Sequence, residues 1–224
     1  MRGEEVYMRI VSHRYLFLAT FLVLTALCFS GCPGISQAVF FKDAALENKI
    51  RYDLGKPLGL LTQRDLLQVK TLIASELGIK DLRGLEYCLN LRVLDLSNNS
   101  ISDLSPLKGV ENKLLENLVW LDLDTNNILN IEPLASLKNL SFLNIDSNQL
   151  TDISPLSGLL NLKGLSLFDN QVGDISALVT NVEVGGLLDY VILDEKTMSE
   201  QALTVDIPRL QALGVNVILV TATS

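Results

Sequence analysis

The chain has 224 residues, 48% of them hydrophobic, and its formal net charge at pH 7 is −8. This length and composition are sufficient for a folded domain with a substantial apolar core. An acidic chain without a Lys- or Arg-rich run lacks the positive surface that phosphate backbones require, which excludes nucleic acid as a partner.

The N-terminal region has the pattern of a secretory leader. Residues 16–29 are an uninterrupted run of apolar or small residues, and Arg9, His13 and Arg14 precede it. A membrane-spanning helix needs about 20 apolar residues, more than this run supplies. The sequence therefore predicts a signal peptide over residues 1–31 rather than a permanent transmembrane helix.

Residues 29–32, FSGC, resemble the cleavage site of bacterial lipoproteins, although Phe29 stands where an aliphatic residue is usual. The resemblance implies cleavage before Cys32, a lipid on its thiol, and anchoring to a bacterial membrane that faces the periplasm or the exterior. Residues 32–39 would then form a short tether. Ordinary cleavage near Ala38 is the alternative.

The middle of the chain repeats one pattern. Residues 91–101, LRVLDLSNNSI, follow L-x-x-L-x-L-x-x-N-x-I, and the pattern returns three more times. Its asparagines are Asn99, Asn126, Asn148 and Asn170, separated by 27, 22 and 22 residues. A fixed period of this length predicts a solenoid, in which each coil buries its apolar side against neighbouring coils.

This pattern resembles the leucine-rich repeat family, and residues 101–107 (ISDLSPL) and 150–156 (LTDISPL) are similar to its bacterial internalin-like branch. The resemblance implies an α/β fold, a leucine-rich repeat solenoid in the form of a curved horseshoe with a parallel sheet on its concave face. The repeats would occupy residues 71–198. A helical N-terminal cap (40–70) and a helix-strand C-terminal cap (199–224) would close the two ends.

Both caps have their own start and stop signals. Asp43 predicts the N-cap of one helix, and residues 62–65 (TQRD) approximate a capping box for a second. Near the other end we expect a loop over residues 182–188, with its turn at the two adjacent glycines. A helix that ends at Gly214 and a strand over residues 215–220 follow.

Within each repeat, leucines alternate with variable residues, which is the period of a strand with one buried face. The asparagine ends the strand, and its carboxamide can donate to and accept from main-chain groups that the turn leaves unpaired. We therefore expect the four asparagines to form a structural ladder. On the other side of the coils, Pro106, Pro133 and Pro155 predict tight turns before a buried leucine.

The outward-facing residues form three rows on the predicted concave face. The first row is Thr71, Val93, Trp120, Phe142, Gly164 and Tyr190; the second is Ile73, Asp95, Asp122, Asn144, Ser166 and Ile192; the third is Ser75, Ser97, Asp124, Asp146, Phe168 and Asp194. Aromatic residues gather in the first row and carboxylates in the other two. Exposed aromatic residues in a concavity anchor partners, because they bury a large area at a low entropic cost.

We predict that these rows contain a partner-binding site, made of Trp120, Phe142, Tyr190, Asp95, Asp122, Asp124, Asn144, Asp146 and Phe168. Like charges on adjacent strands destabilise each other, so solvent and salt, a cation or a basic partner must offset them. Calcium needs six or more converging oxygens, which short aspartates on a gently curved sheet supply with difficulty. A protein or peptide with basic and apolar groups fits both kinds of row. A carbohydrate would use the same aromatic residues.

The composition argues against catalysis. The single histidine, His13, is in the predicted leader, which removes most acid-base and nucleophile-histidine arrangements and histidine zinc sites. Phosphate-binding glycine motifs are absent from the sequence. We therefore predict a lipid-anchored, non-catalytic binding module of the cell envelope, without catalytic residues, cofactor or metal. An envelope scaffold or adhesion component with a permanent partner, or a carbohydrate-binding protein, is the alternative.

Overall fold

The computed structural model of the protein describes residues 37–110 and 115–221. The predicted signal peptide (1–31), the predicted lipidation site Cys32 and the tether up to residue 36 lie outside the described residues. Residues 222–224 of the predicted C-terminal cap lie outside them as well. Along the described part of the chain, no helix is long and apolar enough to span a membrane.

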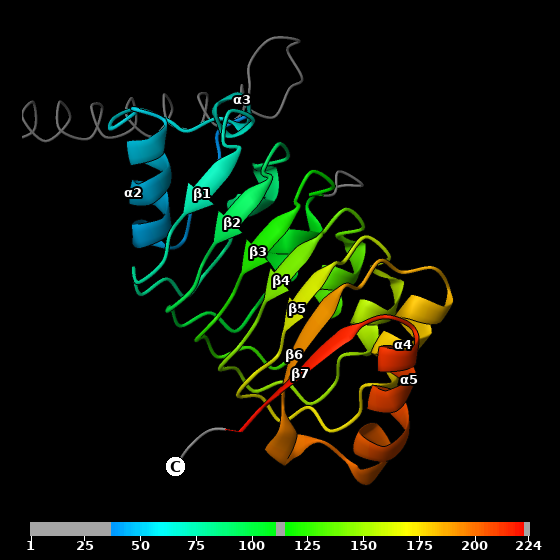
Figure 1. The fold of residues 1–224 in the computed structure, drawn as a ribbon. Helices are drawn as coiled ribbons and strands as arrows, with labels where there is room; N and C mark the ends of the chain where they lie inside the picture. The colour runs from blue at the N-terminus through cyan, green and yellow to red at the C-terminus, as the bar shows by residue number, and fades with distance from the viewer. Residues whose placement is uncertain (1–36, 111–114, 222–224) are drawn as a thin grey trace, which may run out of the picture. The chain divides into compact units, whose positions relative to one another are not determined.

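Seven strands form one open parallel sheet, in the same order as in the sequence (Figure 1). They are β1 (Thr71–Ile73), β2 (Val93–Asp95), β3 (Trp120–Asp122), β4 (Phe142–Asn144), β5 (Gly164–Ser166), β6 (Tyr190–Asp194) and β7 (Asn216–Val220). Every neighbouring pair is parallel. This arrangement confirms the predicted α/β solenoid, in which each coil adds one strand.

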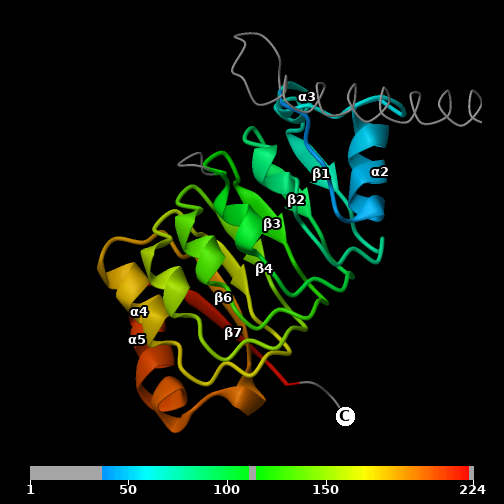
Figure 2. The same ribbon diagram turned by 180° about the vertical axis from the view of Figure 1, so that it is seen from behind.

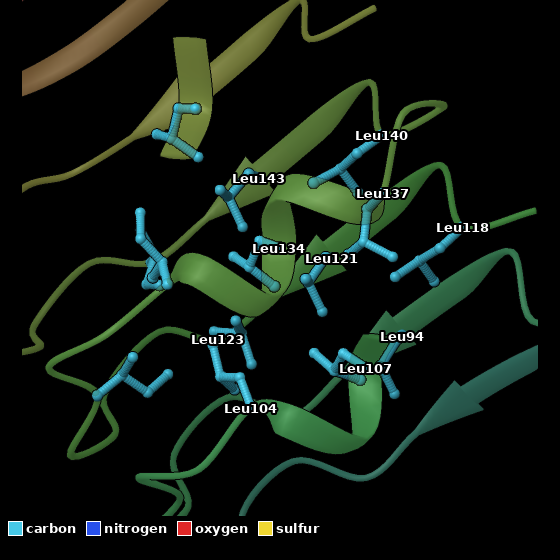
Figure 3. Close-up of a cluster of buried hydrophobic side chains, with 14 of the residues drawn as sticks. Leu94, Leu104, Leu107, Leu118, Leu121, Leu123, Leu134, Leu137, Leu140 and Leu143 are labelled. Carbon is cyan, nitrogen blue, oxygen red and sulfur yellow. The ribbon is translucent and has the colours of Figure 1, made fainter. Parts of the chain in front are cut away.

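One face of the sheet is packed into the core. Leu94, Leu121 and Leu143 occupy paired positions on adjacent strands, and all three have 0% exposure. In Figure 3 they lie in one cluster with Leu107 and Leu134, which come from the opposite wall of the coils. Full burial of one leucine contributes about 1.5–3 kcal/mol, so this continuous stack is the main stabilising element of the solenoid.

The opposite wall of the coils consists of short 3-10 helices (Figure 2). Those of the first four coils are Leu85–Tyr87, Ser105–Lys108, Glu132–Ser136 and Ser154–Gly158. The last three carry a proline in their first turn, where the missing N–H has no partner to lose, and a buried leucine follows it. The Oδ1 atom of Asp103 accepts the Ser105 N–H at 2.8 Å, which stabilises the turn that begins the second of these helices. The predicted proline turns are therefore confirmed.

Helix α2 (Ala44–Asp53) begins where the sequence predicts it. The Oδ1 atom of Asp43 accepts the N–H groups of Ala45 and Leu46 at 3.0 and 3.2 Å, which satisfies two donors at the helix start. Its Oδ2 atom accepts the Lys80 N–H at 2.8 Å. One carboxylate thus caps the helix and ties it to the first coil.

Helix α3 (Gln63–Leu66) is a single turn, closed by the predicted capping box. The Thr62 side chain accepts the Asp65 N–H, and the Asp65 carboxylate accepts the Thr62 N–H at 2.8 Å. This reciprocal pair satisfies two N–H donors at the start of the helix. Together α2 and α3 cover the apolar end of the first coil, beside β1 (Figure 1).

The predicted loop over residues 182–188 is partly wrong. Helix α4 (Ser176–Glu183) continues into it, and the chain turns at Gly185, where φ is +98°. The step from Leu165 to Val191 is 26 residues rather than 22, and the added residues lengthen the convex segment into an α-helix.

The C-terminal cap follows the prediction in outline. A π-helix (Ala202–Asp206) leads into α5 (Ile207–Ala212), Gly214 ends the helical segment with φ +93°, and β7 extends the sheet. Pro208 has no N–H for an α-helical bond, which accounts for the widened turn before it.

The sequence did not reveal a left-handed residue at the end of the strands. The residue before each ladder asparagine has a positive φ, and the first coil has one at the equivalent place: Glu76, Asn98, Thr125, Ser147 and Asp169, with φ between 49° and 60°. Only Asn98 and Asp169 are of the residue types that adopt this region with low strain.

Candidate functional site

The concave face, meaning the outer face of the sheet, presents the predicted rows in register, but Ser166 and Asp194, which were predicted to face outward, are buried. Paired neighbours in the first row are Val93, Trp120, Phe142, Gly164 and Tyr190, and in the second row Asp95, Asp122, Asn144 and Ser166. The third row continues beyond the strands, because the N–H of Thr125 donates to Asp146 O and that of Ser147 donates to Phe168 O. The predicted site residues on β2 to β5 are therefore brought together on one surface.

Trp120 and Phe142 stack on each other across β3 and β4. Their ring centroids are 5.6 Å apart and their planes differ by 6°, which is the geometry of an offset stacked pair. Both side chains remain partly exposed. Each ring covers part of one face of the other, so the pair presents one joint apolar surface to the solvent.

Tyr190 extends this aromatic row over Gly164. A Cβ atom built on Gly164 would lie 2.5 Å from the Tyr190 Oη atom and 2.6 Å from its Cζ atom. The phenol therefore occupies the space that a side chain on β5 would fill. The missing side chain of Gly164 lets the aromatic surface continue from β3 to β6.

The carboxylates of the second and third rows are held by the chain in different ways. Asp95 Oδ1 accepts the N–H and the hydroxyl of Ser97 at 3.0 and 2.7 Å. Asp146 Oδ1 accepts the Ser166 hydroxyl at 2.6 Å and the Phe168 N–H at 2.7 Å. Ser166 thus positions a site carboxylate, although sequence reasoning placed it in the second row without a role.

Asp122 lies at the centre of the acidic rows. Its Oδ1 atom accepts the Asp124 N–H at 3.0 Å, and its Oδ2 atom accepts the Asn144 amide at 3.4 Å. Burial raises the pKa of Asp122 above its ordinary value, and the negative charges of Asp95 and Asp124 raise it further. Burial also raises the pKa of Asp146, with further contributions from the charges of Asp124 and Asp122. The charges acting on both carboxyls are those of other aspartates.

Cations of the described residues form their ion pairs elsewhere on the surface, for example Lys108 with Glu132 and Arg209 with Glu183. Within residues 37–110 and 115–221, no group of three or more His, Cys, Asp or Glu is arranged to hold a metal ion. Cys88 is a free cysteine of this part of the chain, and its side chain is buried. Burial raises the pKa of its thiol to about 12, so it is not a nucleophile. The geometry supports binding through charge and apolar contact.

Comparisons with known proteins bear on the repeat. The family description "Leucine Rich repeats (2 copies)" matches residues 68–109. Leucine-rich repeat-containing protein 56 of Rattus norvegicus is 38% identical over 86 residues, which are 38% of this chain and 13% of that protein. The fold is a leucine-rich repeat solenoid.

Two solved structures extend the similarity beyond the matched repeats. An internalin, inlF, from Listeria monocytogenes is 25% identical with a TM-score of 0.57, over 87% of this chain and 62% of that chain. The functional domain of InlJ from the same organism shares the fold, with 18% identity and a TM-score of 0.55 over 85% and 46% of the two chains. This leucine-rich repeat chain therefore spans less than two thirds of each relative. Its structure is similar to that of bacterial internalins, and such folds generally serve as protein-interaction modules.

The leucine-rich repeat ladder holds the strands that carry the site. The amide of Asn148 donates to Leu123 O on the preceding coil at 2.9 Å and to Asp146 O at 2.8 Å, and its Oδ1 atom accepts the Ile128 N–H at 3.0 Å. Equivalent bonds are made by Asn99, Asn126 and Asn170. Each asparagine thus fixes its coil to the one before it and keeps the rows aligned.

Proposed function

We propose that this chain is a non-catalytic protein-binding module of a bacterial cell envelope, anchored by a lipid on Cys32, and that its concave face holds a protein or peptide partner. The observation that carries the proposal is the partly exposed Trp120–Phe142 stack beside the like-charged Asp95 and Asp122. The similarity to internalin structures and the predicted leader support a place at the cell envelope.

The chemistry of the two kinds of row defines the partner. An apolar side chain that covers the Trp120–Phe142 pair gains from burial of aromatic surface. A neighbouring Lys or Arg of the partner neutralises Asp122, because burial and then its negative neighbours make its charge unfavourable in the free protein. A segment that combines both groups is therefore recognised better than one that has either alone.

A carbohydrate is the second candidate, because partly exposed aromatic rings beside carboxylates also suit a sugar. The stacking favours the protein partner: a sugar ring binds by lying flat on an aromatic face, and one face of each ring is already partly covered by the other ring. An oligosaccharide panel that fails to compete with the partner would support the protein assignment, and saturable competition would replace it.

The partner site is tested by cross-linking in living cells. A photoreactive amino acid at Val93, in the first row, is expected to capture a defined partner. Trp120→Ala combined with Asp122→Asn is expected to reduce the yield about 30-fold, since loss of a central anchor costs about 2 kcal/mol.

The matched control combines Leu129→Ala with Asp169→Asn, which removes one exposed apolar group and one exposed carboxylate outside the rows. Unchanged capture by the Trp120 and Asp122 variant would move the binding site off the concave face.

The anchor is tested separately. Cys32→Ser is expected to shift the protein from the membrane fraction to the soluble fraction of cell envelopes, because the lipid supplies the apolar attachment. Retention of the variant in membranes after high-salt washing would reject lipid attachment at Cys32, and it would leave the concave-face assignment untouched.

A further inference from the structure

The N-terminal cap contains the most exposed large hydrophobic residues of the described part of the chain. Phe40, Tyr52, Leu58 and Leu60 are 77%, 82%, 83% and 63% exposed. Within residues 71–110 and 115–221, the exposure of a large hydrophobic residue does not exceed 61%. Single exposed leucines are ordinary, whereas several in one small element mark a surface that contacts something apolar.

Two of these residues, Phe40 and Leu60, lie on segments that pair with each other. The N–H of Val39 donates to Leu61 O at 2.8 Å, and the segments on which they lie run antiparallel. Val39 and Leu61 are buried, with 7% and 1% exposure. Successive residues of paired extended segments point to opposite faces, so the next residues, Phe40 and Leu60, both point outward as neighbours.

The cap also differs from the repeats in charge. Residues 37–70 contain six Lys or Arg and four Asp or Glu, a net charge of +2, whereas residues 71–221 contain nine and twenty, a net charge of −11. Within the cap, Glu47, Asp53 and Asp65 form ion pairs with Arg51, Lys49 and Lys56, and Asp43 accepts backbone N–H groups, so the excess of positive charge comes from the other cap cations. The cap is therefore a basic and apolar end on an acidic solenoid.

We propose that this cap is a membrane-contact surface that takes anionic phospholipid. Phe40, Tyr52, Leu58 and Leu60 enter the headgroup region, while the exposed Lys42 and Lys70 lie among the lipid phosphates, the arrangement in which long basic side chains and aromatic rings are stable at a bilayer surface. The −11 charge of the repeats is repelled by the same anionic surface, so the cap meets the bilayer first.

A bilayer is favoured over a protein as the occupant by the position of the cap in the chain. Cys32, the proposed lipid attachment site, lies eight residues before Phe40, and eight extended residues span at most about 28 Å. A lipid at Cys32 would hold the cap within this distance of the membrane. The exposed residues and the charge of the cap do not depend on that lipid.

The test adds the full chain with Cys28→Ser and Cys32→Ser, so that no lipid is attached, to preformed vesicles. An environment-sensitive fluorophore is placed on Leu58→Cys and, as a control, on Leu129→Cys, which is also exposed but lies in the repeats. Cys88 is buried and does not compete for the label. The vesicles contain phosphatidylcholine with or without phosphatidylglycerol, and a lipid-borne nitroxide as quencher.

The label at position 58 is expected to lose most of its fluorescence in vesicles with phosphatidylglycerol, and the label at position 129 is expected to keep it. Phe40→Ser with Leu60→Ser is expected to abolish the quenching at position 58, whereas Leu129→Ser with Val184→Ser leaves it unchanged. Circular dichroism confirms that both double variants fold.

Absence of quenching at position 58, or equal quenching at both positions, would overturn the proposal. Equal quenching in vesicles with and without phosphatidylglycerol would overturn the assignment to anionic lipid. Trp120→Ala with Asp122→Asn is expected to leave the quenching unchanged, so failure of the membrane contact and failure of the partner site are separate outcomes.

Discussion

Strands β1 to β5 are each followed by a residue with a left-handed backbone conformation. The residue types at these positions differ in how much strain this conformation causes. Each coil turns there through a left-handed residue, and Thr125 is the β-branched member of that set. A branched Cβ crowds the carbonyl in this region, whereas Asn relieves the strain with its short polar side chain. Thr125 is exposed, so its backbone conformation dominates its effect on stability.

Thr125→Asn is therefore expected to raise the free energy of unfolding by about 1 kcal/mol. The reciprocal change, Asn98→Thr, is expected to lower it by a similar amount in the neighbouring coil. Urea denaturation of both variants checks the pair. Equal midpoints for the two variants would show that the left-handed turn does not limit stability.

Asp122 is expected to reduce the stability of the fold at neutral pH. Because its pKa is raised, the folded protein binds the proton more tightly than the unfolded chain does. The contribution of Asp122 to the free energy of unfolding therefore becomes less favourable as pH rises through and above the ordinary pKa near 4. Asp122→Asn is expected to raise the free energy of unfolding by about 0.5–1 kcal/mol at pH 7 and by nothing near pH 3. Urea titrations at the two pH values measure the difference, and a gain that is larger at pH 3 would contradict the sign.

At the scale of whole elements, the solenoid is closed at its N-terminal end by a short element with strong local bonds. Helix α3 has one turn, too short to be stable alone, and the Thr62–Asp65 capping box and the Lys56–Asp65 ion pair compensate for its length. These bonds lower the pKa of Asp65 to about 2, with the Lys56 bond as the largest cause.

Asp65→Ala is expected to lower the free energy of unfolding by about 1 kcal/mol at pH 7. Because the folded-state pKa is below the ordinary value, the contribution of Asp65 is present above about pH 4 and is lost as pH falls to about 2. Thermal unfolding of variant and wild type is expected to converge there. Asp53→Ala, which removes an exposed pair with Lys49, is the control and is expected to cost less than about 0.5 kcal/mol.

The elements also show why part of the fold was predictable. The rows were placed correctly because side chains alternate along a strand and because parallel coils of similar length keep paired positions equivalent, as Trp120 and Phe142 illustrate. Helix α4 was missed because its coil is longer and lacks a proline, so the repeat no longer determined the convex segment.

For the candidate site, too, the sequence predicted which residues share a surface but not their contacts. Which residues share a surface follows from the period, whereas how they touch depends on side-chain conformation. The ring of Tyr190 over Gly164, the Ser166 hydroxyl on Asp146 and the stacking geometry all required the structure.

At the scale of the whole molecule, each coil between the caps contacts chiefly the coils next to it, so stability is a sum over neighbours. Leu121, on the third of seven strands, is fully buried between two such neighbours. Damage there is expected to spread first to the adjoining coils.

Leu121→Ala is expected to lower the free energy of unfolding by about 2–5 kcal/mol, and Leu129→Ala, at a residue with 61% exposure, by much less. Hydrogen exchange is expected to show the largest loss of protection in β2 to β4, with a smaller loss in β6 and β7. Uniform loss across the sheet would show that the solenoid unfolds as one cooperative unit.

The asparagine ladder has a further consequence for how such a chain can change over generations. Every bond of Asn148 goes to its own coil or to the coil before it. Duplication or deletion of one 22-residue unit therefore reproduces the same bonds at the new junction. The number of repeats can therefore change while both caps are kept. Each duplicated repeat would add its own outward-facing residues to the rows of the concave face. Gain or loss of one repeat thus enlarges or shortens the binding surface of the protein in a single step, and the fold stays the same.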